Sequence, residues 1–477
     1  MDPYDLLIVG GGINGAAIAR DAAIREARVL LVERDDLASH TSSASSKLIH
    51  GGLRYLEYYE FRLVREALQE REILLRTAPH IVRPLRFVLP NAKAMHARWK
   101  VRAGLYLYDL FAIRGSLPRS RRVGARHGGL LDPLKEQRGA LSYWDGWADD
   151  SRLTILNAVD AAEHGAEIAT RTALLAARRE VGLWQAELSD GRTVAAKAMI
   201  NAAGPWVADV LGLAGVPARS KTRLIKGSHI VVAALWEGDQ AFILPQPDGR
   251  VVFALPWLGQ FTLIGTTDVS VGSAQNPAIT EKETRYLCDA ANRYFSAQIR
   301  PVDVLHSYSG VRALYDDGEK DAKAVTRDWH LDLDDTGGAP LLSIYGGKIT
   351  SARALAQQAL DRLAVPGRRS TSWKILPGGD LYPAFIEWLE TLSAWMPAPL
   401  LARLSQAYGT RLKQLVGDAV SLKQLGRHFG GGLYESELIW LRDREFARTA
   451  DDVLFRRTKL GLTLSVAERR AVEKWFG

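Results

Sequence analysis

Residues 4–36, YDLLIVGGGINGAAIARDAAIREARVLLVERDD, decide the fold of this chain. Two apolar runs, YDLLIV and ARVLLV, flank an alanine-rich stretch, and this order predicts a strand, a helix and a second strand. Gly10, Gly12 and Gly15 stand where the first strand meets the helix, so the backbone can turn tightly and approach a pyrophosphate. Glu33 ends the second strand, where its carboxylate can accept hydrogen bonds from the hydroxyls of an adenosine ribose. The stretch predicts a dinucleotide-binding domain, with NAD and FAD both open at this point.

The composition is that of a soluble protein of two or three domains. Of 477 residues, 47% are hydrophobic and 24% are charged, and no run approaches the roughly 18 apolar residues of a membrane-spanning helix. The single cysteine, Cys288, excludes an internal disulfide framework and is expected to be a buried thiol in a reducing cytoplasm. Any membrane contact is therefore expected to be peripheral.

The positive charge of the chain is concentrated in one segment. The net charge is +8, and residues 93–126 contain nine Lys and Arg residues against the single acid Asp109. Within this segment, WKVRAGLYLYDLFAIRG predicts a basic helix with an apolar stripe. The stripe consists of Trp99, Ala103, Tyr106, Leu110 and Ile113. Either the helix lies on an anionic membrane, or the stripe faces the core and the basic side is solvated. Nucleic acid is not expected as a partner, because no recognisable binding motif accompanies the charge.

Two later stretches predict returns of the chain to the nucleotide-binding domain and favour FAD over NAD. Residues 195–215 have the pattern of a strand, a Gly-Pro turn and a helix. Residues 339–363 have the pattern of a strand, a Gly346-Gly347 turn and a helix that starts near Lys348. Paired glycines let the backbone approach a flat ring, and a helix N-terminus can stabilise negative charge on a reduced isoalloxazine.

The remaining patterns predict an α/β flavoprotein. Residues 221–335 are mainly strand-like, and the chain from residue 377 onward is helical in pattern. We therefore predict a Rossmann-like FAD-binding domain interleaved with an antiparallel-sheet substrate domain, followed by a helical C-terminal cap domain. The predicted segments are 1–75, 146–220 and 336–376 for FAD binding, 76–145 for a substrate- or membrane-facing insertion, 221–335 for the substrate sheet, and 377–477 for the cap.

Several motifs spread over the chain carry a specific resemblance. They are GGGINGAAIARDAA, TSSASSKLIHGGLRYLEYYEFRLVREAL, RLIKGSHIVV, GTTDV, SGVRAL and YGGKIT, with RRTKLG near the C-terminus. In this order and spacing, the chain resembles the FAD-dependent glycerol-3-phosphate dehydrogenases of the bacterial aerobic type. The resemblance implies oxidation of sn-glycerol 3-phosphate to dihydroxyacetone phosphate by hydride transfer to flavin N5, with the electrons passed to membrane quinone. It also implies a cytoplasmic protein that is peripheral on the cytoplasmic face of the inner membrane, and it is compatible with a homodimer.

The resemblance implies substrate-binding roles for residues of these motifs. A phosphate monoester carries two negative charges and needs guanidinium or ammonium partners. Arg54 and Arg312 are the expected phosphate and substrate clamps, and Lys348 is expected to contact substrate or hold the flavin edge. The hydroxyls of Tyr55 and Thr267 are expected to hydrogen-bond substrate oxygens.

Two routes stay open for the proton of the substrate C2 hydroxyl. A neutral histidine suits the task of a general base, which makes His50 and His229 the candidates. A cationic Arg54, Arg312 or Lys348 beside the oxygen could instead lower the pKa of the hydroxyl.

The expected cofactor contacts come from the glycine turn, the serine-rich loop beyond Glu33 and the two returning turns. Hydroxyls and a lysine in that loop are expected to bind the pyrophosphate and flavin, and no metal site is predicted. The cofactor contacts are Gly10, Gly12, Gly15, Glu33, Ser42, Ser46, Lys47, Leu48, Ala203, Gly204, Gly346, Gly347 and Thr350.

Two motifs depart from the family pattern. Ser351-Ala352 follow Thr350 where Thr-Tyr is usual, which removes an aromatic side chain near the flavin, and Ala313 stands where proline is usual. Neither removes a charged contact, so substrate geometry or affinity is expected to differ while the reaction is kept. Competing interpretations are a soluble oxidase of the same flavin fold that reduces oxygen, and a flavin-dependent protein that modifies or binds nucleic acid.

Overall fold

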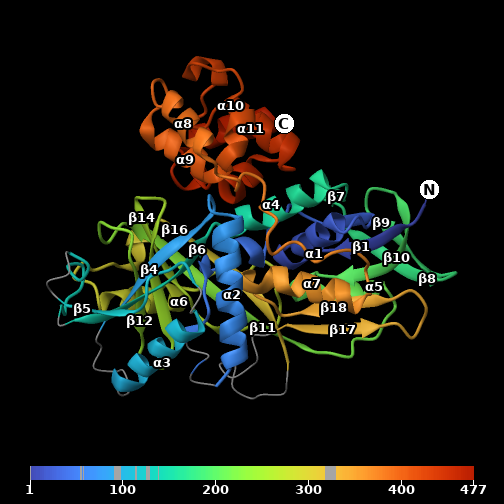
Figure 1. The fold of residues 1–477 in the computed structure, drawn as a ribbon, viewed down its shortest axis with the longest axis horizontal. Coiled ribbons are helices and arrows are strands. Elements are labelled where there is room, and N and C mark those ends of the chain that lie inside the picture. Colours follow the sequence, from blue (N-terminus) through green and yellow to red (C-terminus); the bar gives the residue numbers. More distant parts are fainter. Residues whose placement is uncertain are drawn as a thin grey trace.

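The structure, a computed structural model, describes residues 2–53, 56, 59–90, 98–112, 115–124, 129–137, 139–316 and 329–477, with only the backbone of 98–100. Two β-sheets stand side by side, and a helical C-terminal domain lies over them (Figure 1). The predicted α/β fold with a helical C-terminal domain is confirmed. Within the described residues, no helix is both long and apolar enough to cross a membrane.

The first sheet has the predicted βαβ unit at its centre, in the order β17-β18-β10-β1-β2-β7, with β9 beside β10 and β8 beside β9. Five strands of this sheet pair in parallel: β18, β10, β1, β2 and β7. Helices cover both faces of the sheet. Leu6 and Ile8 pack against α1, α4 and α7, whereas Leu7 and Val9 pack on the opposite side with α5. This alternation follows from the two-residue period of a strand. The bounds are β1 Tyr4–Val9, α1 Ile13–Ile24, β2 Val29–Glu33, α4 Asp150–Glu163, β7 Glu167–Thr170, β8 Leu174–Glu180, β9 Leu183–Leu188, β10 Thr193–Asn201, α5 Val207–Leu213, β17 His330–Asp334, β18 Leu341–Tyr345 and α7 Ala352–Arg362.

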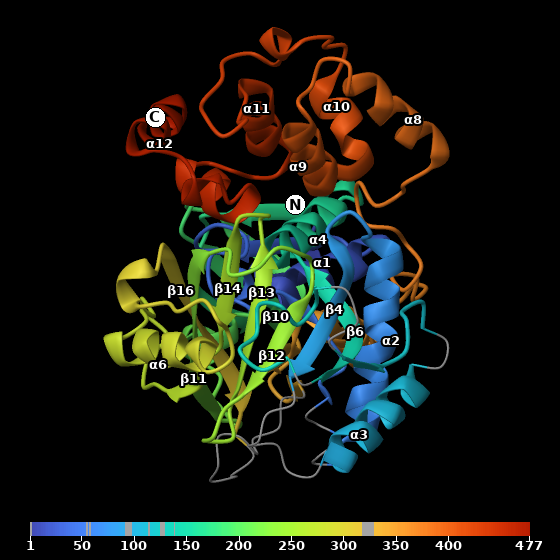
Figure 2. The same ribbon diagram turned by 90° about the vertical axis from the view of Figure 1, so that its left-hand side faces the viewer.

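The second sheet is mostly antiparallel and runs β15-β11-β14-β13-β12-β4-β6-β3, with β16 beside β11 and β5 beside β6. Helix α6 covers one face, and Cys288 of this helix is buried in that core at 1% exposure, as predicted. Helices α2 and α3 cover the other face (Figure 2). The bounds are β3 Leu48–Ile49, α2 Phe61–Thr77, β4 Val82–Pro90, α3 Arg98–Phe111, β5 Arg121–Val123, β6 Ala140–Ala148, β11 Thr222–Ala233, β12 Ala241–Pro245, β13 Val251–Trp257, β14 Phe261–Gly265, β15 Val269–Ser270, α6 Glu281–Asn292 and β16 His306–Tyr315.

Two short strands fall on the other side of the predicted segment boundaries. β3 pairs with β6 of the second sheet, although it lies within the first predicted FAD-binding segment. β17 pairs with β18 of the first sheet, although it lies within the predicted substrate segment. The six-part division otherwise stays a prediction.

Helix α3 places the predicted apolar stripe toward solvent. Tyr106 is 70% exposed and Leu110 45% exposed, whereas Leu105 and Tyr108 are each 1% exposed and pack in the core under α3. Arg102 is exposed on the same side as Tyr106. Trp99 and Ile113 lie outside the described side chains. The helix therefore has a second apolar face that supplies its core contacts, and the predicted stripe stays available on the surface.

The C-terminal domain has its own hydrophobic core and lies over α4 (Figures 1 and 2). At the interface, Arg152 of α4 donates from Nη2 to Glu445 Oε1 at 2.9 Å, and both side chains are buried. The bounds of its α-helices are α8 Pro383–Leu392, α9 Ala398–Tyr408, α10 Leu412–Val416, α11 Glu435–Arg444 and α12 Val466–Phe476.

Candidate active site

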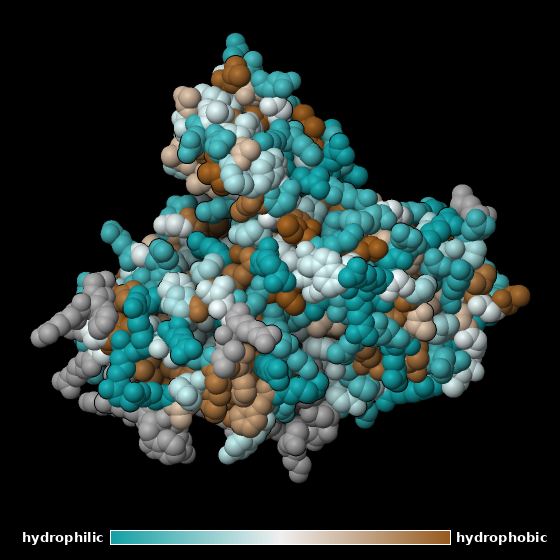
Figure 3. All heavy atoms as spheres, in the orientation of Figure 1, coloured by the Kyte–Doolittle hydropathy of each residue, from teal (hydrophilic) through white to brown (hydrophobic). Residues whose placement is uncertain are grey.

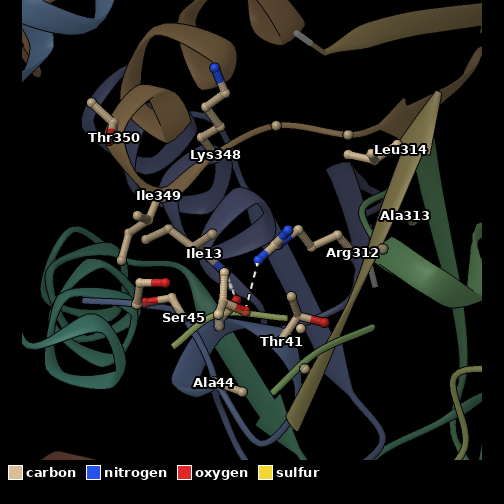
Figure 4. A pocket seen from close by; sticks show the side chains of 18 of the residues that line it. Ile13, Thr41, Ala44, Ser45, Arg312, Ala313, Leu314, Lys348, Ile349 and Thr350 are labelled. Carbon is tan, nitrogen blue, oxygen red and sulfur yellow. Dashed lines mark hydrogen bonds between the residues drawn. The ribbon is translucent and has the colours of Figure 1, made fainter. Parts of the chain in front are cut away.

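A cavity of about 1600 Å³ lies between the two sheets. Its wall is built from the glycine turn before α1, the loop that follows β2, strand β16 and the Gly346-Gly347 turn before α7. Figure 4 shows Arg312 extending from β16 toward Ile13 at the N-terminus of α1. The sequence segments predicted to carry chemistry, some of them more than 300 residues apart, therefore meet at one cavity.

The glycine turn leaves the start of α1 open toward the cavity. Gly10 has φ +113°, and a Cβ at this position would lie 2.6 Å from the carbonyl oxygen of Ala202. A Cβ on Gly15 would lie 1.9 Å from the carbonyl oxygen of Gly10, so helix and strand touch backbone to backbone. Gly12 faces the cavity, and the backbone N–H of Ile13 donates to Ser42 Oγ at 2.9 Å. Such a helix N-terminus, approached without side-chain hindrance, fits a pyrophosphate.

Glu33 lies at the end of β2 with its carboxylate turned back toward the turn. Its two oxygens accept from the backbone N–H groups of Gly11 at 2.7 Å and Asp35 at 2.9 Å. Burial raises the pKa of the Glu33 carboxyl, although both N–H groups act to lower it. Each carboxylate oxygen can accept a second hydrogen bond, so both ribose hydroxyls can still be bound. Asp35 is itself paired with His40, whose Nε2 lies 2.7 Å from Asp35 Oδ2.

The loop that follows β2 presents its side chains to two sides. Ser42, Ser46 and Leu48 line the cavity, as predicted cofactor contacts should. Lys47 points away from it: its side chain is buried, and Nζ donates to Asp150 Oδ1 at 2.8 Å and to the carbonyl oxygen of Ser43 at 3.3 Å. The structure thus brings three of the four predicted loop residues to the cavity and holds the lysine outside it.

The two returning turns form the opposite wall. Ala203 and Gly204 line the cavity after β10, and Gly346 and Gly347 line it after β18. The carbonyl oxygen of Gly346 accepts from Asn14 Nδ2 at 3.2 Å, which ties this turn to the start of α1.

Around Lys348 and Thr350, both predicted site residues, a 3-10 turn over Ile349–Ser351 precedes α7. The helix therefore begins at Ala352, slightly later than predicted. Thr350 is buried, and its Oγ1 accepts from the backbone N–H of His50 at 3.4 Å. In Figure 4 the side chain of Lys348 points away from that of Arg312.

Arg312 is the predicted substrate residue that most clearly reaches the cavity. Its Nη1 donates to Asp268 Oδ1 at 2.7 Å and its Nη2 to Thr266 Oγ1 at 3.5 Å, and all three residues line the cavity. Thr267 faces the other way at 1% exposure, donating to Glu283 Oε1 at 2.9 Å and accepting from the backbone N–H of Ser228. Arg54 and Tyr55 lie outside the described residues.

Glu283, the partner of Thr267, is a strongly held anion on α6. Burial acts to raise the pKa of its carboxyl, but hydrogen bonds from Lys226, Thr280 and Thr267 lower it to about 2. The Thr267 hydroxyl is therefore tied to a carboxylate that stays charged over the physiological range.

The two candidate histidines differ in their access to the cavity. His50 lines it, with its ring centroid 6.5 Å from that of Phe253. His229 is 1% exposed and lies behind Ser46, whose Oγ is 2.9 Å from His229 Nε2, and it stacks on Tyr308. Burial, reinforced by nearby cations, lowers the pKa of His229 well below its ordinary value, so the ring is neutral near pH 7. His229 therefore reaches the cavity through a serine hydroxyl.

Asp268 and Thr266 are cavity residues that the sequence reasoning did not single out. Both lie in the GTTDV motif, in which only Thr267 was chosen. Adjacent residues of a strand point to opposite sides, so a strand-like reading of the motif places Thr266 and Asp268 on a side that Thr267 does not share, although the structure has these residues between β14 and β15. That alternation was the available signal.

Residues 5–353 match the family described as FAD dependent oxidoreductase. The chain belongs to this family, and FAD is its cofactor. The open glycine turn, the buried Glu33 carboxylate and the glycine pair before α7 fit that cofactor.

Within the family, relatives align over nearly the whole chain. It is 49% identical to the D-erythritol 1-phosphate dehydrogenase of Brucella abortus (99% of this chain, 97% of that protein). It is also 49% identical to the glycerol-3-phosphate dehydrogenase of Pseudomonas aeruginosa (98% and 93%) and 44% identical to the aerobic glycerol-3-phosphate dehydrogenase of Escherichia coli (100% and 98%). The resemblance to the aerobic glycerol-3-phosphate dehydrogenases is confirmed.

Solved structures share the fold. The glycerol-3-phosphate dehydrogenase from Bacillus halodurans, complexed with FAD, superimposes with a TM-score of 0.77 at 27% identity, covering 100% of this chain and 91% of that one. The L-alpha-glycerophosphate oxidase from Mycoplasma pneumoniae has a TM-score of 0.58 at 18% identity, covering 78% of this chain and 98% of that one, which shows the shared fold alone.

Proposed function

We propose that this protein is an FAD-dependent dehydrogenase that oxidises sn-glycerol 3-phosphate to dihydroxyacetone phosphate and passes the electrons to a membrane quinone. The observation that carries the proposal is Arg312, whose guanidinium enters from β16 the cavity that the glycine turn before α1 and the Gly346-Gly347 turn also line. The chain is 44–49% identical to glycerol-3-phosphate dehydrogenases. A guanidinium binds a phosphate monoester through two parallel hydrogen bonds, which fixes the substrate as well as attracting it.

Asp268 orients this guanidinium before substrate arrives. The contacts with Asp268 Oδ1 and Thr266 Oγ1 use two of the five N–H groups of the guanidinium, so the others can bind the phosphate. We assign the remaining phosphate and substrate contacts to Arg54, Tyr55 and Lys348. We give Thr267 a positioning role, since its hydroxyl already joins β11 to Glu283.

The reaction requires that hydride leave C2 while the C2 hydroxyl loses its proton. Bound FAD supplies the acceptor for the hydride. Either His50, which lines the cavity, takes the proton directly, or neutral His229 takes it through Ser46 Oγ. In the alternative route, Arg312 or Lys348 stabilises the alkoxide and lowers the hydroxyl pKa. The variants His50→Asn and His229→Asn distinguish these routes. The residue that acts as base controls the acidic limb of the kcat/KM pH profile, so only its replacement should remove that limb.

The apolar end of the cavity supports the quinone and membrane part of the proposal. Leu63 of α2 and Val101 and Leu107 of α3 line this end. Outside it, apolar side chains reach the surface near the ends of α2 and α3 (Figure 3), including Phe61 at 40% exposure and Tyr106 at 70%. We propose that this surface, with its basic flank, rests on the anionic cytoplasmic face of the inner membrane.

D-Erythritol 1-phosphate is the second candidate substrate, because the relative named for it is as similar to this chain as the glycerol-3-phosphate dehydrogenase of Pseudomonas aeruginosa. Both compounds are polyol monophosphates, so the same phosphate clamp serves either. Ala313, beside the clamp, stands where proline is usual. A homodimer remains compatible with the proposal.

A dye-coupled assay of the FAD-loaded protein tests the substrate. Glycerol 3-phosphate should reduce the dye with a kcat/KM well above that for D-erythritol 1-phosphate, and glycerol should be inactive because it lacks the phosphate. Preference for the erythritol compound would change the assigned substrate, and activity with glycerol would contradict the phosphate clamp.

A further inference from the structure

The RRTKLG motif near the C-terminus has no role in the proposed chemistry, yet it lies against the loop that holds the cofactor. Loop 39–47 separates the cofactor cavity from a second cavity of about 850 Å³. Ser42, Ser45 and Ser46 face the first cavity, whereas Ser43 and Lys47 face the second. The far wall of the second cavity includes residues of the C-terminal domain, among them Arg456 and Lys459. The loop is thus a thin partition with the C-terminal domain on its other side.

Three cations of the C-terminal domain bind carboxylates on both flanks of this loop. Arg457 Nη2 donates to Asp36 Oδ1 at 2.9 Å, and Arg456 Nε donates to Asp36 Oδ2 at 2.6 Å. Lys459 Nζ donates to both carboxylate oxygens of Asp149 at the start of α4. Arg457 and Asp36 are 1% and 2% exposed. Buried pairs of this kind are strongly destabilising to break, because one partner is left as an uncompensated charge.

The contact continues from Asp149 into the loop itself. Asp150, the next residue, accepts from Lys47 Nζ at 2.8 Å and from Ser45 Oγ at 2.7 Å. Lys459 Nζ also donates to Ser151 Oγ at 2.9 Å. The first residues of α4 therefore bind the C-terminal domain through Lys459 and bind loop 39–47 through Asp150. Burial acts to raise the pKa of the Asp149 carboxyl, and the charges of Lys459 and Lys47 hold it below its ordinary value.

We propose that the C-terminal domain, through Arg457 and Lys459, positions loop 39–47 for FAD and so sets the affinity of the protein for its cofactor. Ser45 and Lys47, both bound to Asp150, flank Ser46 in the chain, and Ser46 faces the cofactor cavity together with Ser42. A shift of the anchors therefore moves the cavity-facing hydroxyls with them. Arg457 and Lys459 are positioning residues, since both act through carboxylates of the FAD-binding domain. The proposal rests on the cofactor and is independent of the substrate.

A matched control separates this role from general support of the C-terminal domain. Arg403 forms a partly buried pair with Glu437 within that domain, with Nη1 donating to Glu437 Oε1 at 2.7 Å. Arg403→Met should lower the melting temperature without reaching loop 39–47. Lys459→Met removes a more deeply buried charge, with a side-chain exposure of 7% against 21% for Arg403, and this charge does reach the loop.

The test measures the Kd for FAD by quenching of flavin fluorescence as the apoprotein is reconstituted, beside the melting temperature of each variant. Lys459→Met should weaken FAD binding by about tenfold, a usual strength of coupling between linked sites. Arg403→Met should leave the Kd within about twofold of wild type while lowering the melting temperature. Asp150→Asn should raise the Kd for FAD to a similar extent. In the double variant with Lys459→Met, the Kd should be no higher than the higher of the two single-variant values.

Two results would overturn the proposal. One is an unchanged Kd in Lys459→Met together with a lowered melting temperature, which would make the motif a domain contact only. The other is strict additivity of Lys459→Met and Asp150→Asn, which would mean that the two residues act on FAD independently. If Lys459→Met does not fold, Arg457→Lys, which keeps the charge but loses the two-point contact with Asp36, supplies the same comparison.

Discussion

The substitution Gly15→Ala tests the backbone contact on which the cofactor site depends. The new methyl group would lie 1.9 Å from the carbonyl oxygen of Gly10 and 3.1 Å from its carbon. Both are backbone atoms of the turn, so neither can swing aside as a side chain could, and α1 must move away from β1. Overpacking of this kind costs about 1–3 kcal/mol.

Because the displaced atoms form the pyrophosphate cradle, we expect this cost to appear in FAD binding. At about 1.4 kcal/mol per tenfold change, the Kd for FAD should rise between about fivefold and 150-fold. Gly212→Ala is the matched control, since Gly212 lies in α5 and a Cβ there meets nothing within 4 Å. That variant should bind FAD as wild type does and be slightly more stable, because alanine favours a helix over glycine.

The assay is fluorescence titration of FAD into each apoprotein, with circular dichroism to show that the fold is kept. Folded Gly15→Ala with a Kd within twofold of wild type would refute the reasoning. It would mean that the helix relaxes freely and that the close contact does not shape the site.

Three further predictions concern substrate, membrane and pH. Arg312→Ala should raise KM for glycerol 3-phosphate by a factor corresponding to roughly 2 kcal/mol with FAD still bound, and loss of FAD would instead assign the residue to the cofactor. Serine at Tyr106 and Leu110 should reduce sedimentation with anionic vesicles, whereas serine at exposed Val302 should not; equal loss in both would contradict a membrane role for α3. Burial and a neighbouring guanidinium lower the pKa of His80 to about 3, so between pH 6 and 4.5 the unfolded chain binds a proton that the folded protein does not. Stability should therefore fall as the pH falls, and His80→Gln should remove up to about 1.4 kcal/mol per pH unit of that slope; identical slopes would contradict the assignment.

The first βαβ unit was predictable because its signals are local. A continuous apolar run from Leu6 to Val9 defines β1, and the close contact of Gly15 with Gly10 lies within the same thirty residues. The orientation of the side chains in loop 39–47 was harder to predict. Nothing near Lys47 in the sequence shows that its partner is Asp150, about a hundred residues away, so the side to which the lysine points could not be read from the loop.

Helix α3 shows a second limit. A spacing of three and four residues fits the stripe of Tyr106 and Leu110, and it fits Leu105 and Tyr108 equally well. Only the position of the second sheet decides which face is buried. Thr267 failed to reach the cavity for a similar reason, because its partner Glu283 lies on α6, outside the motif.

The role of the late RRTKLG motif was also beyond the sequence. Its resemblance to a family motif marks it, but the partners Asp36 and Asp149 are more than 300 residues away. Long-range ion pairs between domains leave no periodic pattern in either segment. The function of such a motif becomes visible only when the domains are placed together.

The most direct test of the central claim is anaerobic mixing of the FAD-loaded protein with glycerol 3-phosphate while the flavin absorbance is followed, and then addition of a ubiquinone analogue or of air. Glycerol 3-phosphate should bleach the flavin and glycerol should not, and the yellow colour should recover rapidly on addition of quinone. Recovery that is fast only with air would make the protein an oxidase. A flavin that glycerol 3-phosphate does not bleach would contradict the proposed reaction while leaving the fold and the cofactor unchanged.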